Sequence, residues 1–172
     1  MFVRFILKRR EEKGRQAIVS HSSVYDILAE LRWETAAARV AVVKCHNGGA
    51  VPTARTPLYS TALYEVSEAA HGPIREKWQG LPIDKAYTDL LSTVVEDGSV
   101  RVHVGEVNPG STLAAIYGTA GVQTVVKHYI THDASGLYYL SVQWTDSDHS
   151  ITPPQALAIQ AAIPRLKRCL ES

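Results

Sequence analysis

The spacing of hydrophobic residues in the first part of the chain predicts two helices. Residues 2–16 have an apolar start and a mixed-charge end, which is typical of a short helix. Gly14 and the polar residues after it predict a break. Ser23, with Asp26 three residues later, resembles a capping box and predicts that a second helix begins there. The apolar stripe of this second helix consists of Val24, Ile27, Leu28 and Leu31.

Five later segments have the patterns of β-strands. Residues 40–45 are almost continuously apolar, which predicts a central strand buried on both faces. Residues 58–66 are rich in Tyr and Thr, and residues 100–104 alternate between valine and polar side chains. The last two strands, 122–131 and 137–144, are separated by a hairpin-like segment.

Three helices are predicted between and after these strands. Pro82 suits the start of one helix and Gly98 its C-terminal end. Residues 113–120 predict a short helix that ends at Gly121, and Pro153 opens the last helix. Because the last two strands pair as a hairpin, the order of elements favours an α+β domain. We expect a five- or six-stranded, mainly antiparallel sheet with helices packed on it.

Composition is consistent with one ordinary globular domain. The chain has 172 residues, of which 45% are hydrophobic and 20% charged, and these values exclude a disordered or fibrous protein. Two cysteines are too few for a disulfide framework, so we expect a reducing compartment. No apolar run is long enough for a membrane span. Residues 1–7 are apolar, but their cations follow them and no cleavage site appears, so a signal peptide is not expected.

Charge is concentrated at the N-terminus. The net charge is +1, yet residues 1–16 hold six cations and two glutamates and sum to +4. We therefore expect residues 1–21 to form a basic arm or short helix, and residues 22–172 to form the domain. The arm has three possible roles: it packs on its own domain, it anchors the chain to other subunits or to its own copies, or it lies weakly on an anionic membrane. Sequence-specific nucleic-acid binding is not expected. The residues expected to make these contacts are Phe2, Arg4, Phe5, Ile6, Leu7, Arg9, Arg10 and Lys13.

Candidate catalytic and metal-binding groups are sparse. Cys45 and His46 are neighbours on a predicted strand and point to opposite faces, so His46 cannot serve as the base for that thiol. His128, His132 and Asp133 could approach one another, but their spacing is not diagnostic of a metal site. No phosphate-binding glycine loop and no G-x-S-x-G motif occurs. We therefore expect no catalytic residue, no metal and no cofactor, and a protein that is not an enzyme.

One segment carries a family resemblance. Residues 39–49, Arg-Val-Ala-Val-Val-Lys-Cys-His-Asn-Gly-Gly, follow an amphipathic helix and resemble the first strand of a divergent GAF-like family. In that family a strand ends in His-Asn-Gly, and the next strand carries Ser or Thr before a Glu. Here Ser60, Thr61 and Glu65 match that second strand. The motif residues are His46, Asn47, Gly48, Gly49 and Glu65; we expect His46 to hydrogen bond across the turn.

The resemblance covers residues 22–170 and implies a fold and two alternative functions. The fold has its first and last helices packed together behind one face of the sheet. Members of the family look common in bacteriophage and bacterial genomes, so the function expected first is a protein-interaction module, located in a virion or another multi-subunit assembly. The alternative is a small-molecule-binding sensor domain in a bacterial cytoplasm.

Aromatic side chains bear on this choice. Nine of them could line a pocket for a planar ligand, as GAF domains often do, or could form core and interface, which we favour. They are Tyr59, Tyr64, Trp78, Tyr87, Tyr117, Tyr129, Tyr138, Tyr139 and Trp144.

Overall fold

The computed structural model describes residues 2–48 and 56–172, and for residues 2–11 and 13 it describes only the helical backbone. The helices are α1 (Phe2–Thr35), α2 (Lys85–Asp97), α3 (Thr112–Thr119) and α4 (Pro153–Leu170), with short 3₁₀ helices η1 (Arg75–Lys77) and η2 (Val104–Glu106). The strands are β1 (Arg39–His46), β2 (Tyr59–Ser67), β3 (Leu81–Pro82), β4 (Ser99–His103), β5 (Thr124–Asp133) and β6 (Gly136–Trp144).

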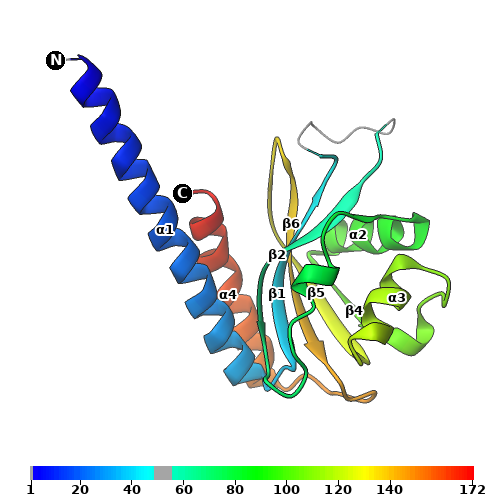
Figure 1. Ribbon diagram of the computed structural model, residues 1–172. Coiled ribbons are helices and arrows are strands. Elements are labelled where there is room, and N and C mark those ends of the chain that lie inside the picture. The colour runs from blue at the N-terminus through cyan, green and yellow to red at the C-terminus, as the bar shows by residue number, and fades with distance from the viewer. Residues whose placement is uncertain (1, 49–55) are drawn as a thin grey trace.

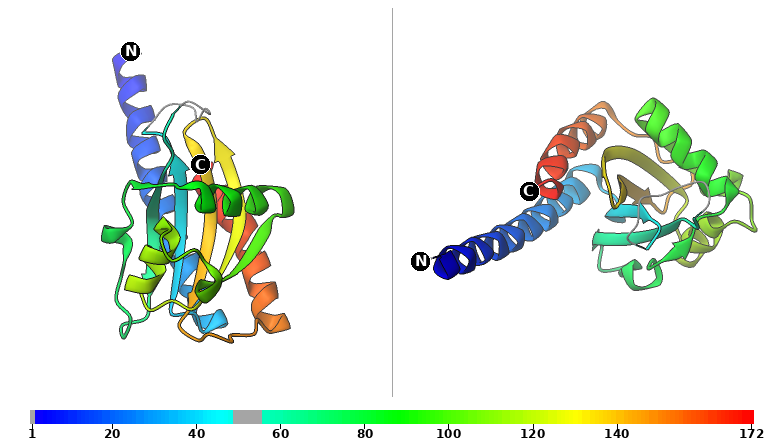
Figure 2. Two further views of the ribbon diagram at one scale, coloured as in Figure 1. Left: turned by 90° about the vertical axis from the view of Figure 1, so that its right-hand side faces the viewer. Right: turned by 90° about the horizontal axis from the view of Figure 1, so that it is seen from above.

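The six strands form one antiparallel sheet in the order β3-β2-β1-β6-β5-β4. Helices α1 and α4 lie side by side on one face, and α2 and α3 cover the other (Figures 1 and 2). The predicted α+β class, the antiparallel sheet and the pairing of the first and last helices are therefore confirmed. The interior position of the strand that begins near Val40 is also confirmed, because β1 lies between β2 and β6.

Strand β1 contributes to two separate apolar cores. Val40 and Val42 point toward α1 and α4, whereas Ala41, Val43 and Cys45 point toward α2 and α3. This division follows from the alternation of side chains along a strand. The second core, under α2 and α3, contains buried tyrosine and tryptophan side chains that carry polar groups.

The predicted break in the first helix is wrong. Helix α1 runs continuously from Phe2 to Thr35, through the expected boundary between residues 21 and 22. Ser23 is not an N-cap, because its Oγ donates to the carbonyl oxygen of Val19 at 3.0 Å, inside the helix. A helical glycine such as Gly14 costs only about 1 kcal/mol relative to alanine. The packed stripe that begins at Val24 offsets such a cost.

The prediction that Pro82 opens a helix is also wrong. Pro82 lies in β3 at the edge of the sheet, opposite Tyr59, where its missing N–H costs little. Helix α2 begins after Asp84, whose carboxylate accepts a hydrogen bond from the Tyr87 amide at 2.8 Å. The predicted stop at Gly98 is confirmed, since this residue is left-handed with φ of 78°.

Candidate functional site

A lysine is completely buried between the sheet and helices α2 and α3. Lys127 lies on β5 with no exposed surface. Val125, two residues earlier on the same strand, belongs to the second core, so the two side chains point to the same face of the sheet. Within the described residues no acidic side chain forms an ion pair with it. A buried cation without a counter-ion is costly, so its presence requires an explanation.

Four aromatic rings surround the Lys127 amino group. Nζ lies 4.2 Å from the ring centre of Tyr139 and 5.3 Å from that of Tyr87. The ring centres of Trp78 and Tyr117 follow at 5.5 and 5.7 Å. All four distances are within the range of cation–π attraction. We call Lys127, these four residues and Ser60 the Lys127 cluster.

Hydrogen bonds connect most of this cluster in a line. The Trp78 indole donates to Ser60 Oγ at 2.8 Å, and Ser60 Oγ lies 2.9 Å from the Tyr87 hydroxyl. The Tyr87 hydroxyl is hydrogen bonded to that of Tyr139, which accepts from Lys127 Nζ at 3.1 Å. The Tyr117 hydroxyl is buried beside Ser141 and lies outside this line.

Burial determines the protonation of the cluster. It lowers the pKa of Lys127 from 10.5 to about 7, so a large fraction of the amine is uncharged at neutral pH. The pKa values of Tyr87, Tyr117 and Tyr139 are raised by the same desolvation, so these hydroxyls keep their protons. The cluster therefore combines an amine that is uncharged in a large fraction of molecules at neutral pH with neutral phenols.

Asp84 holds the two covering helices in position. One carboxylate oxygen accepts from the Tyr87 amide, and the other accepts from the Thr112 amide at 2.7 Å, where α3 begins. The hydrogen bond from the Thr112 amide is the main cause that holds the pKa of Asp84 below its usual value. Burial acts in the opposite direction, and the bond from Tyr87 adds to the lowering. The helices that carry Tyr87 and Tyr117 are thereby joined at their N-termini.

Two depressions flank the cluster. A pocket of about 160 Å³ lies between the η1 loop and α3, and Trp78 forms part of its wall. Its other lining residues are Ile74, Lys77, Leu81, Ala115, Ile116 and Thr119. A second pocket, of about 290 Å³, lies between α2 and the ends of β1 and β6, where it reaches Cys45. Trp78 is thus the residue shared by a pocket and the Lys127 cluster.

His46, Asn47 and Gly48 form a turn outside the Lys127 cluster. The Gly48 amide donates to His46 Nδ1 at 3.1 Å, so Nε2 carries the proton and donates to Thr61 Oγ1 at 2.8 Å. Burial and the Lys44 charge lower the pKa of His46, which favours this neutral form. Gly49 lies outside the described residues.

Glu65 lies at the opposite end of β2. Its carboxylate is buried and contacts Arg39 Nε at 2.7 Å. It also accepts hydrogen bonds from the backbone amides of Ile74 and Arg75. Arg39 in turn donates to the Gly72 carbonyl at 2.9 Å. The pair therefore fixes the segment that leads to Trp78, and it does not face an open pocket.

The other candidate groups do not assemble into a reactive site. Burial raises the pKa of the Cys45 thiol to about 12, so Cys45 is a poor nucleophile. Asp133 organises the β5–β6 hairpin, where it accepts from the Ser135 and Gly136 amides. Throughout the described ranges, no three His, Cys, Asp or Glu side chains gather as metal ligands.

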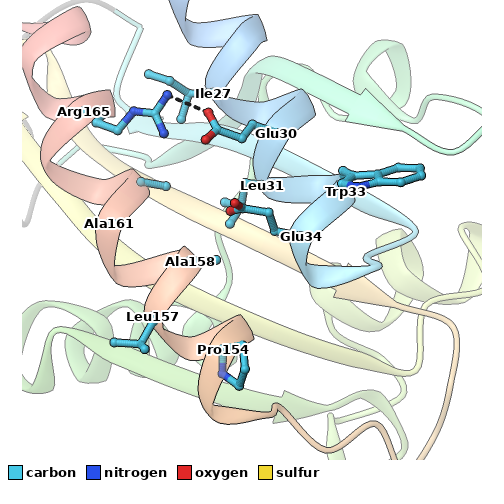
Figure 3. Close-up of a pocket in the computed structure, with 11 residues that line it drawn as sticks. Ile27, Glu30, Leu31, Trp33, Glu34, Pro154, Leu157, Ala158, Ala161 and Arg165 are labelled. Carbon is cyan, nitrogen blue, oxygen red and sulfur yellow. Dashed lines mark hydrogen bonds and ion pairs between the residues drawn. The ribbon is translucent and has the colours of Figure 1, made fainter.

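Helices α1 and α4 border an open groove of about 620 Å³ (Figure 3). Arg165 of α4 and Glu30 of α1 form an ion pair across it at 2.7 Å. Trp33 and Leu157 lie along it with 80% and 66% of their surfaces exposed. The side chains of seven predicted contact residues, Phe2 to Arg10, and that of Lys13 lie outside the described set.

Lys127 was not predicted from the sequence, Ser60 was named only as a match to the family's second strand, and the aromatic residues were named without their grouping. The available signal was the alternation of Val125, Lys127 and Tyr129, which placed a cation on an inward-facing strand position. Of the nine aromatic residues considered, only Trp78, Tyr87, Tyr117 and Tyr139 meet at one point. Tyr64 and Trp144 belong to the opposite core.

The fold is similar to that of known photoreceptor and sensor domains. No family model matches the sequence, and no curated protein does. A far-red cyanobacteriochrome photoreceptor superposes with a TM-score of 0.68 at 11% identity, covering 98% of this chain and 94% of that one. The phycocyanobilin-bound GAF domain of a cyanobacterial phytochrome gives 0.61 at 16% identity, with 97% and 92% covered.

A non-photoreceptor neighbour supports the same fold. The GAF domain of a two-component sensor histidine kinase from Bacillus halodurans gives a TM-score of 0.61 at 9% identity, with 88% of this chain and 92% of that one covered. The chain therefore has the GAF fold, as the resemblance implied. The His-Asn-Gly family and its association with bacteriophages stay predictions. No helix in the described ranges is both long and apolar enough to cross a bilayer.

Proposed function

We propose that this GAF-fold domain is a small-molecule sensor, with its ligand site on the face of the sheet beneath α2 and α3. The observation that carries the proposal is the complete burial of Lys127 without an acidic partner in the described chain. Titratable groups with strongly shifted pKa values concentrate at functional sites. The apolar pocket at Trp78 supplies an adjoining space of ligand size.

The sensor is favoured over a structural subunit of a virion, which was the function expected first. The neighbours named above are photoreceptors and a kinase sensor, and none is a virion protein. The high pKa of Cys45 and the hydrogen-bonded state of His46 support a binding role without catalysis. Turnover that disappears on mutation of Cys45 or His46, with the fold intact, would contradict that role.

A thermal-shift experiment tests the sensor function. The full chain is screened against small uncharged and anionic compounds, and a ligand raises the melting temperature because it binds only the folded state. The shift should be lost in Ile116→Trp, which fills the pocket beside Trp78. It should persist in Tyr64→Phe, which removes a hydroxyl on the other face of the sheet. A shift that Tyr64→Phe abolishes and Ile116→Trp retains would place the site on the other face of the sheet.

We further propose that α1 contacts other subunits or a second copy of this chain. The N-terminal part of α1 projects beyond the body of the domain (Figure 1). Ile18 and Val19, where this projection begins beside the end of α4, are 72% and 58% exposed. Isolated helices are marginal in water, so a projecting apolar and basic helix favours a partner. Light scattering on the full chain and on a form lacking residues 1–16 should show a larger particle only for the full chain. The same number of chains per particle in both forms would refute this contact.

A further inference from the structure

The Lys127 amino group is held in a way that suits an uncharged nucleophile. Among the described residues its one hydrogen bond goes to the Tyr139 hydroxyl, although an ammonium group has three protons to donate. The remaining surroundings are ring faces and apolar atoms. A desolvated lysine of this kind attacks carbonyl carbons, which a hydrated surface ammonium does not.

The route to this amine leads through Trp78. One part of the indole forms the wall of the pocket of about 160 Å³, and the ring lies 5.5 Å from Lys127 Nζ. A cavity of about 150 Å³ accommodates a molecule the size of benzene. The lining is mostly apolar, with Ile74, Leu81 and Ile116 around the indole. A small, uncharged, mainly apolar molecule therefore fits the pocket, and it reaches the amine only if the indole turns aside.

The aromatic faces decide which electrophile fits. A ring face is electrostatically negative, so it stabilises a cation and repels an anion. Carbon dioxide would convert the amine into an anionic carbamate against four ring faces. An aldehyde or ketone would convert it into an imine, whose protonated form is a cation that the rings stabilise. The surroundings thus favour a carbonyl compound.

Resting on the sensor function proposed above, we propose that Lys127 is the attachment site for a small apolar aldehyde or ketone, held as an imine. The Nζ lone pair forms a bond to the carbonyl carbon, and the carbonyl π pair moves to oxygen. A proton passes from nitrogen to that oxygen to give a carbinolamine. The nitrogen lone pair then forms the C=N bond while the hydroxyl takes up a proton and leaves as water. The resulting iminium nitrogen gives one proton back, so one amine and one carbonyl yield one imine and one water.

Tyr139 is placed to supply the proton for the loss of water. Its hydroxyl lies 3.1 Å from Nζ and is hydrogen bonded to Tyr87, which continues to Ser60. Because burial raises the pKa of Tyr139, the phenol keeps its proton at neutral pH. Loss of a positioned acid typically slows such a step by about 10²–10⁴-fold. Tyr139 is therefore a positioned proton donor in this step.

Trapping with benzaldehyde tests the attachment. The full chain is incubated with benzaldehyde at pH 7.5, reduced with cyanoborohydride and mapped by peptide mass spectrometry. Lys127 should carry the benzyl group at concentrations at least about tenfold below those that label exposed Lys85, because its amine is largely uncharged. Lys127→Met should abolish this label, Lys85→Met should not, and Tyr139→Phe should slow it. Circular dichroism confirms that each variant is folded.

A comparison with benzyl alcohol separates this inference from the sensor function. The alcohol has the shape of benzaldehyde but forms no imine. If both compounds raise the melting temperature equally and Lys127 stays unlabelled, the sensor stands and the covalent attachment is refuted. If the label appears only on exposed lysines and neither compound shifts the melting temperature, the covalent attachment is refuted. Small aromatic compounds of this kind are then also excluded as ligands of the sensor.

Discussion

At the scale of single residues, Lys127 should make stability depend on pH. The folded-state pKa is about 7 and the ordinary value is 10.5, so between these values the unfolded chain binds more protons. The free energy of unfolding therefore rises with pH in this window, by up to about 1.4 kcal/mol per unit. Denaturant titrations at pH 6.5, 8 and 9.5 should show this rise relative to Lys127→Met. The exposed control Lys85→Met should keep the rise, and an identical pH profile for wild type and Lys127→Met would falsify the assignment.

At position 136 a close approach of the backbone leaves no room for a side chain. Gly136 opens β6 with φ of 154°, and an added Cβ would lie 2.1 Å from the Cys45 carbonyl oxygen. Gly136→Ala should therefore lower the free energy of unfolding by at least about 2 kcal/mol. Gly118→Ala is the matched control, because α3 leaves that position open. It should be neutral or gain up to about 1 kcal/mol. A loss of similar size at both positions would contradict the steric argument.

At the scale of elements, the Arg39–Glu65 pair joins β1 and β2 to the segment before η1. Arg39→Met should cost about 3–5 kcal/mol in urea unfolding, because it leaves a buried carboxylate without its cation. Arg165→Met removes the partner of Glu30 at an exposed pair and should change stability little. Equal effects of the two substitutions would mean that burial does not strengthen the first pair.

The elements differ in how well the sequence predicts them. Patterns with strong periods, such as the strand that begins at Val40 and the stripe from Val24 to Leu31, were predicted well because burial enforces the period. The break near Gly14 was predicted wrongly because local propensity is worth about 1 kcal/mol and tertiary packing exceeds it. The Lys127 cluster brings together side chains from β2, α2, α3, β5 and β6 and from the loop after η1 that holds Trp78, and no local pattern contains that information.

At the scale of the whole molecule, the sheet should be most stable at its centre. Strand β1 is bonded on both edges and buried on both faces, whereas β3 and β4 lie at the edges. Hydrogen exchange followed by mass spectrometry should show the slowest amides in β1 and β6, and faster exchange in β4 and α3. Exchange in β1 as fast as in β4 would contradict this order and would indicate that the whole sheet opens as one unit.

The overhang of α1 gives the molecule a mechanical property. Residues 16–21 of α1 lie beside the end of α4, while the fourteen residues from 2 to 15 extend further as a helix. At 1.5 Å per residue this free rod is about 21 Å long. A tilt of about 10° at the seam would displace its tip by about 4 Å, on the same rise per residue. A small change of angle where α1 meets α4 is thus enlarged along the helix in proportion to its length.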